Sequence, residues 1–180
     1  MRARAISFLI LNVLLLLSGH GPAQTLPTEY QIKAAFIFNF ARFIVWPPKA
    51  FPQPASPLII GILGDNPFHD DLQRTLRDKT VDNHPLVIRE LSSPAEATNC
   101  QILFISTSEK PRLTQILQGL KGASVLTVAE MDRFTENGGM INFVQEGTKI
   151  RFQINNEAAI REGLKISSKL LSLALRPGAS

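Results

Sequence analysis

Short apolar runs alternate with helical patterns through the middle of the chain. The apolar runs are 58–63, 86–91, 101–106 and 124–128. Helical spacing is found between them, near 68–77, 93–97 and 109–118. Apolar strands separated by helices are typical of βαβ units around a largely parallel sheet. Because such crossovers are right-handed, they place helices on both faces of that sheet.

The last part of the chain has a different pattern. Two apolar stretches, 140–145 and 148–154, flank Glu146-Gly147, which predicts a β-hairpin. Two closing helices follow at 155–162 and 168–175, with Gly163 ending the first and Ser167 or Ser168 capping the second. The pattern as a whole predicts an α/β fold: a mixed, largely parallel sheet of about six strands with helices on both faces, ending in a hairpin and two short helices.

Residues 28–45 predict a long helix that precedes the sheet. Thr28 can cap it, no Gly or Pro interrupts it, and the prolines after Trp46 end it. At about 100° per residue, the apolar side chains of Phe38 and Val45 fall beside a narrow polar stripe that contains Arg42. An apolar side chain among polar neighbours can mark a partner surface; a loop that covers it is the alternative. The candidate partner-binding residues are therefore Phe38, Arg42, Val45 and Trp46.

Two loops are candidates for ligand contact. The stretch LIIGILGDNPFHDD ends a strand in a Gly/Asp loop, but it matches neither a dinucleotide fingerprint nor a phosphate loop. Asp65 or Asn66 can cap the turn before Pro67, and a ligand-contact role for this pair is the alternative. The segment from Lys165 through Ser167 and Ser168 opens the last helix, where free N–H groups could hold a small anion. An ordinary capped helix start is the alternative there.

The N-terminal 23 residues read as a secretory signal peptide. Arg2 and Arg4 precede an apolar run of about a dozen residues, and small residues follow at Gly21 and Ala23. We expect cleavage after Ala23, export to the periplasm, and one domain over 24–180; an uncleaved signal anchor is the alternative. Loss of the two arginines lowers the net charge from +4 to +2. No Lys/Arg-rich run remains, which argues against nucleic-acid binding.

The chain offers no recognisable catalytic or metal-binding set. Outside the leader there are two histidines, His69 and His84, and no third ligand at a suitable spacing. The Gly-x-Ser-x-Gly motif of many hydrolases is absent. Cys100, the one cysteine, lies beside an apolar run and is expected to be a buried, unreactive thiol. We expect no enzyme activity, no cofactor and no metal.

The same stretches resemble the YfiR family of exported regulators. The matching motifs, in order, are AAFIFNFARFIVWP, IIGILGDNPF, CQILFIS, VLTVAEMDRFTENGGMINF, KIRFQIN and GLKISSKLLSLA. The resemblance implies a periplasmic α/β domain that represses an inner-membrane diguanylate cyclase by binding its periplasmic part. It also implies an outer-membrane lipoprotein that relieves repression by sequestering the regulator. Some members carry disulfides, whereas a single cysteine cannot form one within this chain.

Two kinds of function follow from these observations. The first is a non-enzymatic regulator that represses a membrane-bound diguanylate cyclase and so lowers cyclic diguanylate and biofilm formation. The alternative is a periplasmic small-molecule binding or sensing module that serves another membrane sensor. Strand order, the oligomeric state (a homodimer included) and the identity of any ligand are left open by the sequence.

Overall fold

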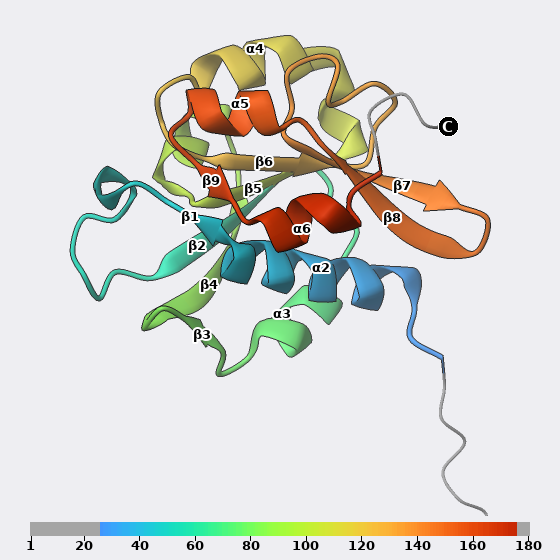
Figure 1. Ribbon diagram of the computed structural model, residues 1–180, viewed down its shortest axis with the longest axis horizontal. Helices are drawn as coiled ribbons and strands as arrows, with labels where there is room; N and C mark the ends of the chain where they lie inside the picture. The colour runs from blue at the N-terminus through green and yellow to red at the C-terminus, as the bar shows by residue number, and fades with distance from the viewer. Residues whose placement is uncertain (1–25, 176–180) are drawn as a thin grey trace, which may run out of the picture.

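A curled seven-stranded sheet organises the computed structural model, which describes residues 26–175 (Figure 1). The strands are β2 (Leu58–Leu63), β3 (Thr80–Val81), β4 (His84–Leu91), β5 (Ile102–Ile105), β6 (Leu126–Ala129), β7 (Ile141–Glu146) and β8 (Lys149–Ile154). Their order is β3-β4-β2-β5-β6-β7-β8. The five inner strands are parallel, and β3 and β8 are antiparallel to their neighbours. The prediction of a mixed, largely parallel sheet is confirmed.

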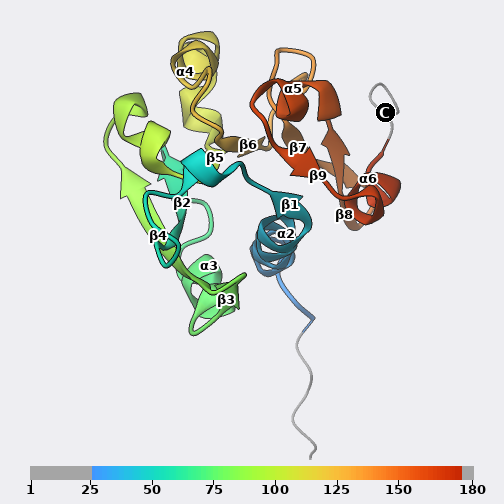
Figure 2. The ribbon, with the colours of Figure 1, turned by 60° about the vertical axis from the view of Figure 1, so that its left-hand side comes forward.

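Helices cover both faces of this sheet, as the sequence predicted. The α-helices are α2 (Glu29–Phe43), α3 (Asp71–Leu76), α4 (Leu113–Gly119), α5 (Asn156–Arg161) and α6 (Ser168–Leu173). Three 3-10 turns add to them: η2 (Pro48–Ala50), η3 (Pro94–Asn99) and η4 (Thr107–Arg112). Figure 2 shows α2 lying in the hollow of the curled sheet, with α4 on the opposite side.

Proline explains why the predicted helix at 109–118 is split. Pro111 lacks an N–H and disfavours the α conformation of the residue before it. The segment therefore begins as the 3-10 turn η4 and becomes the α-helix α4 only at Leu113. Pro94 likewise opens η3, where the sequence predicted a helical segment over 93–97.

The long N-terminal helix predicted over 28–45 forms, but it ends at Phe43, so Val45 lies in strand β1 (Ile44–Val45) and not on the helix. Thr28 Oγ1 accepts a hydrogen bond from the Gln31 N–H, and Gln31 Oε1 accepts one from the Thr28 N–H, which together make a capping box. The residue directly after α2, Ile44, has an extended backbone conformation. One buried side chain of α2, Phe40, belongs to an aromatic cluster with Phe143 and Phe152 of the hairpin.

Two hydrophobic clusters lie on opposite sides of the sheet. In β5, Ile102 and Phe104 belong to the cluster under α2, whereas Leu103 and Ile105 belong to the cluster under α4. Successive side chains of a strand point to opposite faces. A central strand covered on both faces is therefore apolar at every position, which accounts for the unbroken run ILFI.

The glycine pair in GGMINF has a steric basis. Gly138 has a φ of +100°, a conformation that favours glycine. At Gly139, an added Cβ would collide with the ring of Phe134, which is completely buried. The turn before β7 therefore requires glycine at both positions.

Some features differ from the sequence prediction or lie outside the structure. The hairpin turn is Gly147-Thr148 rather than Glu146-Gly147, because Glu146 pairs with Lys149 across the strands. A two-residue strand β1 (Ile44–Val45) pairs with β9 (Lys165–Ile166), which the sequence did not predict. The predicted signal peptide, 1–23, lies outside the described residues. Within residues 26–175, no helix is both long and apolar enough for a membrane span.

Candidate functional site

The β1–β9 ladder joins residues from the two ends of the chain into one surface. Val45 is the register partner of Lys165, so a candidate from the first helix and one from the last turn lie side by side. The Ser167 N–H donates to the Phe43 carbonyl oxygen at 2.9 Å. Lys169 Nζ lies 5.3 Å from the centroid of the Phe43 ring. The sequence treated these two regions as separate candidates; the structure makes them neighbours.

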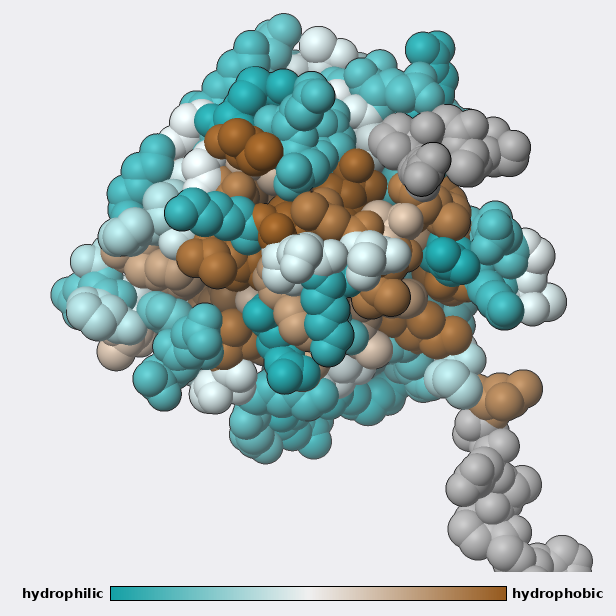
Figure 3. All heavy atoms as spheres, viewed as in Figure 1, coloured by the Kyte–Doolittle hydropathy of each residue, from teal (hydrophilic) through white to brown (hydrophobic). Residues whose placement is uncertain are grey.

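Apolar side chains gather over these elements, as Figure 3 shows along α2 and around α6. Val45 is 63% exposed and Leu173 is 53% exposed, which is unusual for large aliphatic side chains. Phe38 and Phe43 are partly buried beside them. We call this region the α2–α6 surface; its members are Phe38, Arg42, Phe43, Val45, Lys165, Ile166, Lys169, Leu171 and Leu173.

Cations line the apolar part of the α2–α6 surface. Arg42 lies 5.7 Å from the ring centroids of both Phe38 and Phe43, and Lys79 Nζ lies 4.5 Å from that of Phe38. These are cation–π distances. Among the described residues, no carboxylate forms an ion pair with Arg42, Lys79 or the two lysines of the surface. The surface is therefore apolar with a positively charged rim.

Trp46, the fourth candidate partner-binding residue, is buried and does not belong to this surface. Its side chain is only 9% exposed, and its Nε1–H donates to the Gln101 carbonyl oxygen at 3.1 Å. The Gln101 side chain in turn accepts from the Ile59 N–H and donates to the Ala50 carbonyl oxygen. Trp46 therefore holds the proline-containing segment that follows it against the sheet, through a contact with a residue 55 positions away.

The turn at Lys165–Lys169 is an ordinary capped helix start. Ser167 Oγ accepts a hydrogen bond from the Leu170 N–H at 3.2 Å, which is the N-cap contact. Ser168 is exposed at the first position of α6. Of the three candidates there, Lys165 gains a different setting, because β9 places it in the rim of the α2–α6 surface.

At the Gly64 loop, Asn66 rather than Asp65 makes the structural contacts. Asn66 Oδ1 accepts from the Phe68 N–H at 3.0 Å, and its Nδ2 donates to Glu90 Oε1 at 2.6 Å. Asp65 is exposed; its backbone N–H donates to Ser108 Oγ, and its carboxylate accepts no hydrogen bond from a described residue. Gly64 has a φ of +86°, and a Cβ there would overlap Ser108 Oγ. The loop follows the carboxyl end of β2, and β2 runs parallel to β5. Trp46, directly after β1, contacts Gln101 at the amino end of β5. The loop and the β1–β9 ladder therefore lie toward opposite ends of these strands.

We expect Asn66→Ala to lower the free energy of unfolding by about 1 kcal/mol, the usual net contribution of a side-chain hydrogen bond, because its Oδ1 accepts from the Phe68 N–H in this turn. Asp65→Ala should leave it nearly unchanged, because its carboxylate makes no hydrogen bond to a described residue. Urea denaturation of the two variants checks this. Equal losses would show that the turn does not depend on the Asn66 amide.

A buried lysine near the start of α2 was missed by the sequence analysis. Lys33 is fully buried, and its ammonium donates to Glu29 one turn earlier and, at 2.5 Å, to Glu130 at the end of β6. Burial by itself lowers the pKa of Lys33, but the hydrogen bonds to the two glutamates outweigh it and raise that pKa above the ordinary value. The i,i+4 spacing of Glu29 and Lys33 was the available signal; the distant Glu130 was not.

Cys100 is buried, as predicted. It is 3% exposed, and burial raises the pKa of its thiol to about 11. Gly61 on β2 faces it so closely that an added Cβ would lie 2.8 Å from the sulfur. Both observations favour an unreactive thiol.

We expect Cys100 to resist thiol reagents in the folded protein. Because the folded-state pKa of Cys100 exceeds the unfolded value of about 8.5, the neutral thiol predominates in the folded protein at pH 8. The contribution of the neutral thiol to the free energy of unfolding is lost as the pH rises from about 8.5 toward 11. Labelling with a maleimide at pH 8, with and without urea, measures this. Rapid labelling without denaturant would contradict it.

The described residues hold no group of three or more His, Cys, Asp or Glu side chains that could bind a metal ion.

Comparison with known proteins identifies the family to which the chain belongs. Residues 30–175 match the model of the family described as YfiR/HmsC-like. A conserved domain protein from Vibrio cholerae O1 biovar eltor, strain N16961, has a similar structure, with a TM-score of 0.58 at 11% identity.

The similarity to the Vibrio cholerae structure concerns the fold alone, because the identity is low. It covers 83% of this chain and 60% of that one, so this chain spans less than two thirds of its length. The family match is stronger evidence, since residues 30–175 are nearly all of the part of the chain that the structure describes. The chain belongs to the YfiR/HmsC-like family.

Proposed function

We propose that this protein is a non-enzymatic repressor that binds the periplasmic part of an inner-membrane diguanylate cyclase. Repression would lower cyclic diguanylate and biofilm formation. The family membership supports the kind of partner. The observation that carries the binding role is the α2–α6 surface, where Val45 and Leu173 are more than half exposed beside uncompensated cations.

The chemistry of the α2–α6 surface defines the partner it fits. Exposed aliphatic side chains favour an apolar patch on the partner, because burying them removes apolar area from water. Arg42 and Lys165 favour carboxylates around that patch, which would guide the encounter and fix its orientation. We therefore expect the cyclase to present an apolar patch with an acidic rim, and binding to weaken at high salt.

We expect Val45→Asp and Arg42→Glu each to weaken binding by about 1–4 kcal/mol, the range for central interface residues. Both side chains are exposed, so the melting temperature should stay near that of the wild type. Titration of the purified periplasmic domain of the cyclase, with melting curves on the same samples, measures both quantities. Phe38 is less suitable for this test, because it is partly buried against the core.

Ile160 on α5 supplies a matched control. It is 61% exposed, close to the 63% of Val45, but lies outside the α2–α6 surface. Ile160→Asp should bind the cyclase normally. Equal loss in the control, or normal binding by both surface variants, would contradict the proposed interface. In cells, deletion of the protein should raise cyclic diguanylate, and unchanged levels would contradict repression.

Two further partners belong to the same proposal. The family resemblance implies an outer-membrane lipoprotein that sequesters the regulator, and a homodimer would also cover exposed apolar area. Sedimentation of the purified protein alone reports the homodimer. Addition of the lipoprotein to the preformed cyclase complex reports sequestration, because the cyclase domain should be released if the two partners compete.

A further inference from the structure

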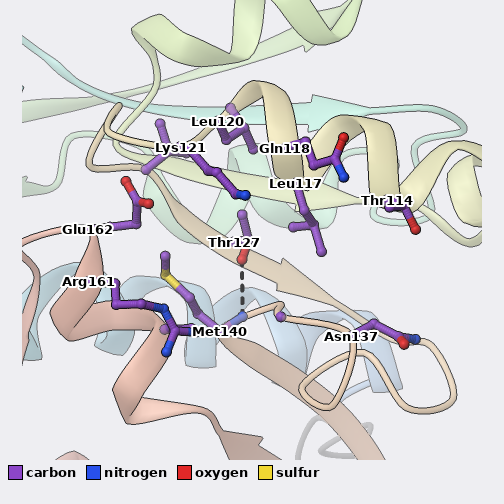
Figure 4. A pocket seen from close by; sticks show the side chains of 13 residues that line it. Thr114, Leu117, Gln118, Leu120, Lys121, Thr127, Asn137, Met140, Arg161 and Glu162 are labelled. Carbon is purple, nitrogen blue, oxygen red and sulfur yellow. Dashed lines mark hydrogen bonds between the residues drawn. The ribbon is translucent and has the colours of Figure 1, made fainter.

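A cavity of about 270 Å³ opens between α4 and α5, away from the residues that the proposed function uses (Figure 4). Its walls come from four segments: α4 with the residues after it, β6, the glycine turn before β7, and α5. It forms because β6 and β7 pair only at Val128 and Ala129, which leaves the first half of β6 without a partner on that side. The apolar lining consists of Leu117, Leu120, Val125, Met140 and Ala158.

Two cations reach this cavity from opposite walls. Lys121 extends from the α4 side and Arg161 from the α5 side, as Figure 4 shows. Neither forms an ion pair with a residue in the described part of the chain. Glu162 also lines the cavity, but its Oε2 accepts from the Gly122 N–H at 2.7 Å and is committed to that loop.

A buried hydroxyl also lines the cavity. Thr127 is 3% exposed, and its Oγ1 accepts a hydrogen bond from the Met140 N–H at 3.0 Å. Its own hydroxyl hydrogen is donated to no described residue, so it remains available to a bound molecule. The cavity thus offers donors and an apolar lining, which is the usual composition of a small-molecule site.

We propose that this cavity binds a small monocarboxylate with a short apolar body. Two cations and one carboxylate leave a single net positive charge, which matches one negative charge better than two. The apolar lining favours a hydrocarbon or aryl body over a bare inorganic anion. The volume lies just below the range of about 300–1,000 Å³ for drug-sized ligands, which limits the size of the molecule. The proposal does not depend on regulation of a cyclase.

The test uses benzoate and hexanoate as probes, with benzamide and hexanamide as neutral analogues. We expect saturable binding of the two carboxylates by NMR titration of the full mature chain, with the largest amide shifts at Leu117, Thr127 and Met140. The amides should bind at least about tenfold more weakly, because a hydrogen bond to a charged group is worth about 1.5 kcal/mol or more.

Charge-removing variants locate the binding site. Lys121→Gln and Arg161→Gln should each weaken benzoate binding about tenfold, and both side chains are exposed, so the fold should be retained. Lys149→Gln, the same change at the exposed hairpin, should have no effect. Absence of saturable binding, equal binding of acid and amide, unchanged affinity in the two cavity variants, or shifts that map elsewhere would each overturn the proposal.

Discussion

Replacing Glu29 and Glu130 together by glutamine is expected to lower the free energy of unfolding by about 3 kcal/mol. The change leaves the ammonium of Lys33 fully buried without its two carboxylates. An uncompensated buried charge usually costs about 3–5 kcal/mol. The lower end applies here, because the glutamate side chains are 44% and 34% exposed and water can partly replace them.

Adding Lys33→Met to the double variant provides the control. Methionine keeps much of the volume and removes the charge, so most of the lost stability should return. Urea denaturation at pH 7 measures the three proteins. If the triple variant is no more stable than the double variant, the loss does not come from the buried charge.

In the alkaline range, the free energy of unfolding of the wild type and that of the double variant should change with pH in opposite directions. In the wild type the folded-state pKa of Lys33 is raised, so its contribution is complete below the unfolded value of about 10.4 and is lost as the pH rises through the folded-state pKa. Without the glutamates, burial alone remains and lowers that pKa, so the double variant should regain stability as the pH rises toward 10.4. Between pH 7 and 10, measured unfolding should show no change from Lys33 in the wild type and rising stability in the double variant.

Phe40→Ala is expected to cost about 3–5 kcal/mol of stability, the usual cost of removing a buried phenylalanine ring. Phe40 is completely buried, and its ring centroid lies 5.7 Å from that of Phe143 and 5.2 Å from that of Phe152. These contacts hold α2 against the β7–β8 hairpin. A loss of this size should be visible as a large shift of the urea midpoint with an unchanged slope.

Phe38→Ala, two residues earlier on the same helix, is the matched comparison. Phe38 is only partly buried and contacts Arg42 and Lys79 through cation–π pairs, so its truncation should cost clearly less. Similar losses for Phe38→Ala and Phe40→Ala would show that both rings belong to the core. In that case Phe38 would have to be removed from the proposed α2–α6 surface.

The elements of the fold could be predicted from the sequence because they depend on local patterns. The run 58–63 was predicted as a strand and is β2, and Thr28 was predicted to cap the first helix and does so. The burial of Cys100 was predicted from the apolar run beside it. In each case the deciding information lies within about ten residues, the length of one strand or helix.

Two features of the candidate sites were decided only by the tertiary structure, because each depends on residues far apart in the chain. Trp46 is buried since its indole N–H reaches Gln101, 55 residues away, and not because of its neighbours. Lys33 can be buried because Glu130, 97 residues away and directly after β6, accepts a hydrogen bond from its ammonium.

The α2–α6 surface and the cavity between α4 and α5 also depend on contacts between residues far apart in the chain. The sequence by itself determined which side chains of the first helix are apolar, but Val45 became part of a larger surface only through pairing with Lys165. The cavity between α4 and α5 left no trace in the sequence, because Lys121 and Arg161, 40 positions apart, line one cavity only where β7 diverges from β6. A local pattern determines which face of an element is apolar; which faces meet, and what is left between them, is decided by the packing of whole elements.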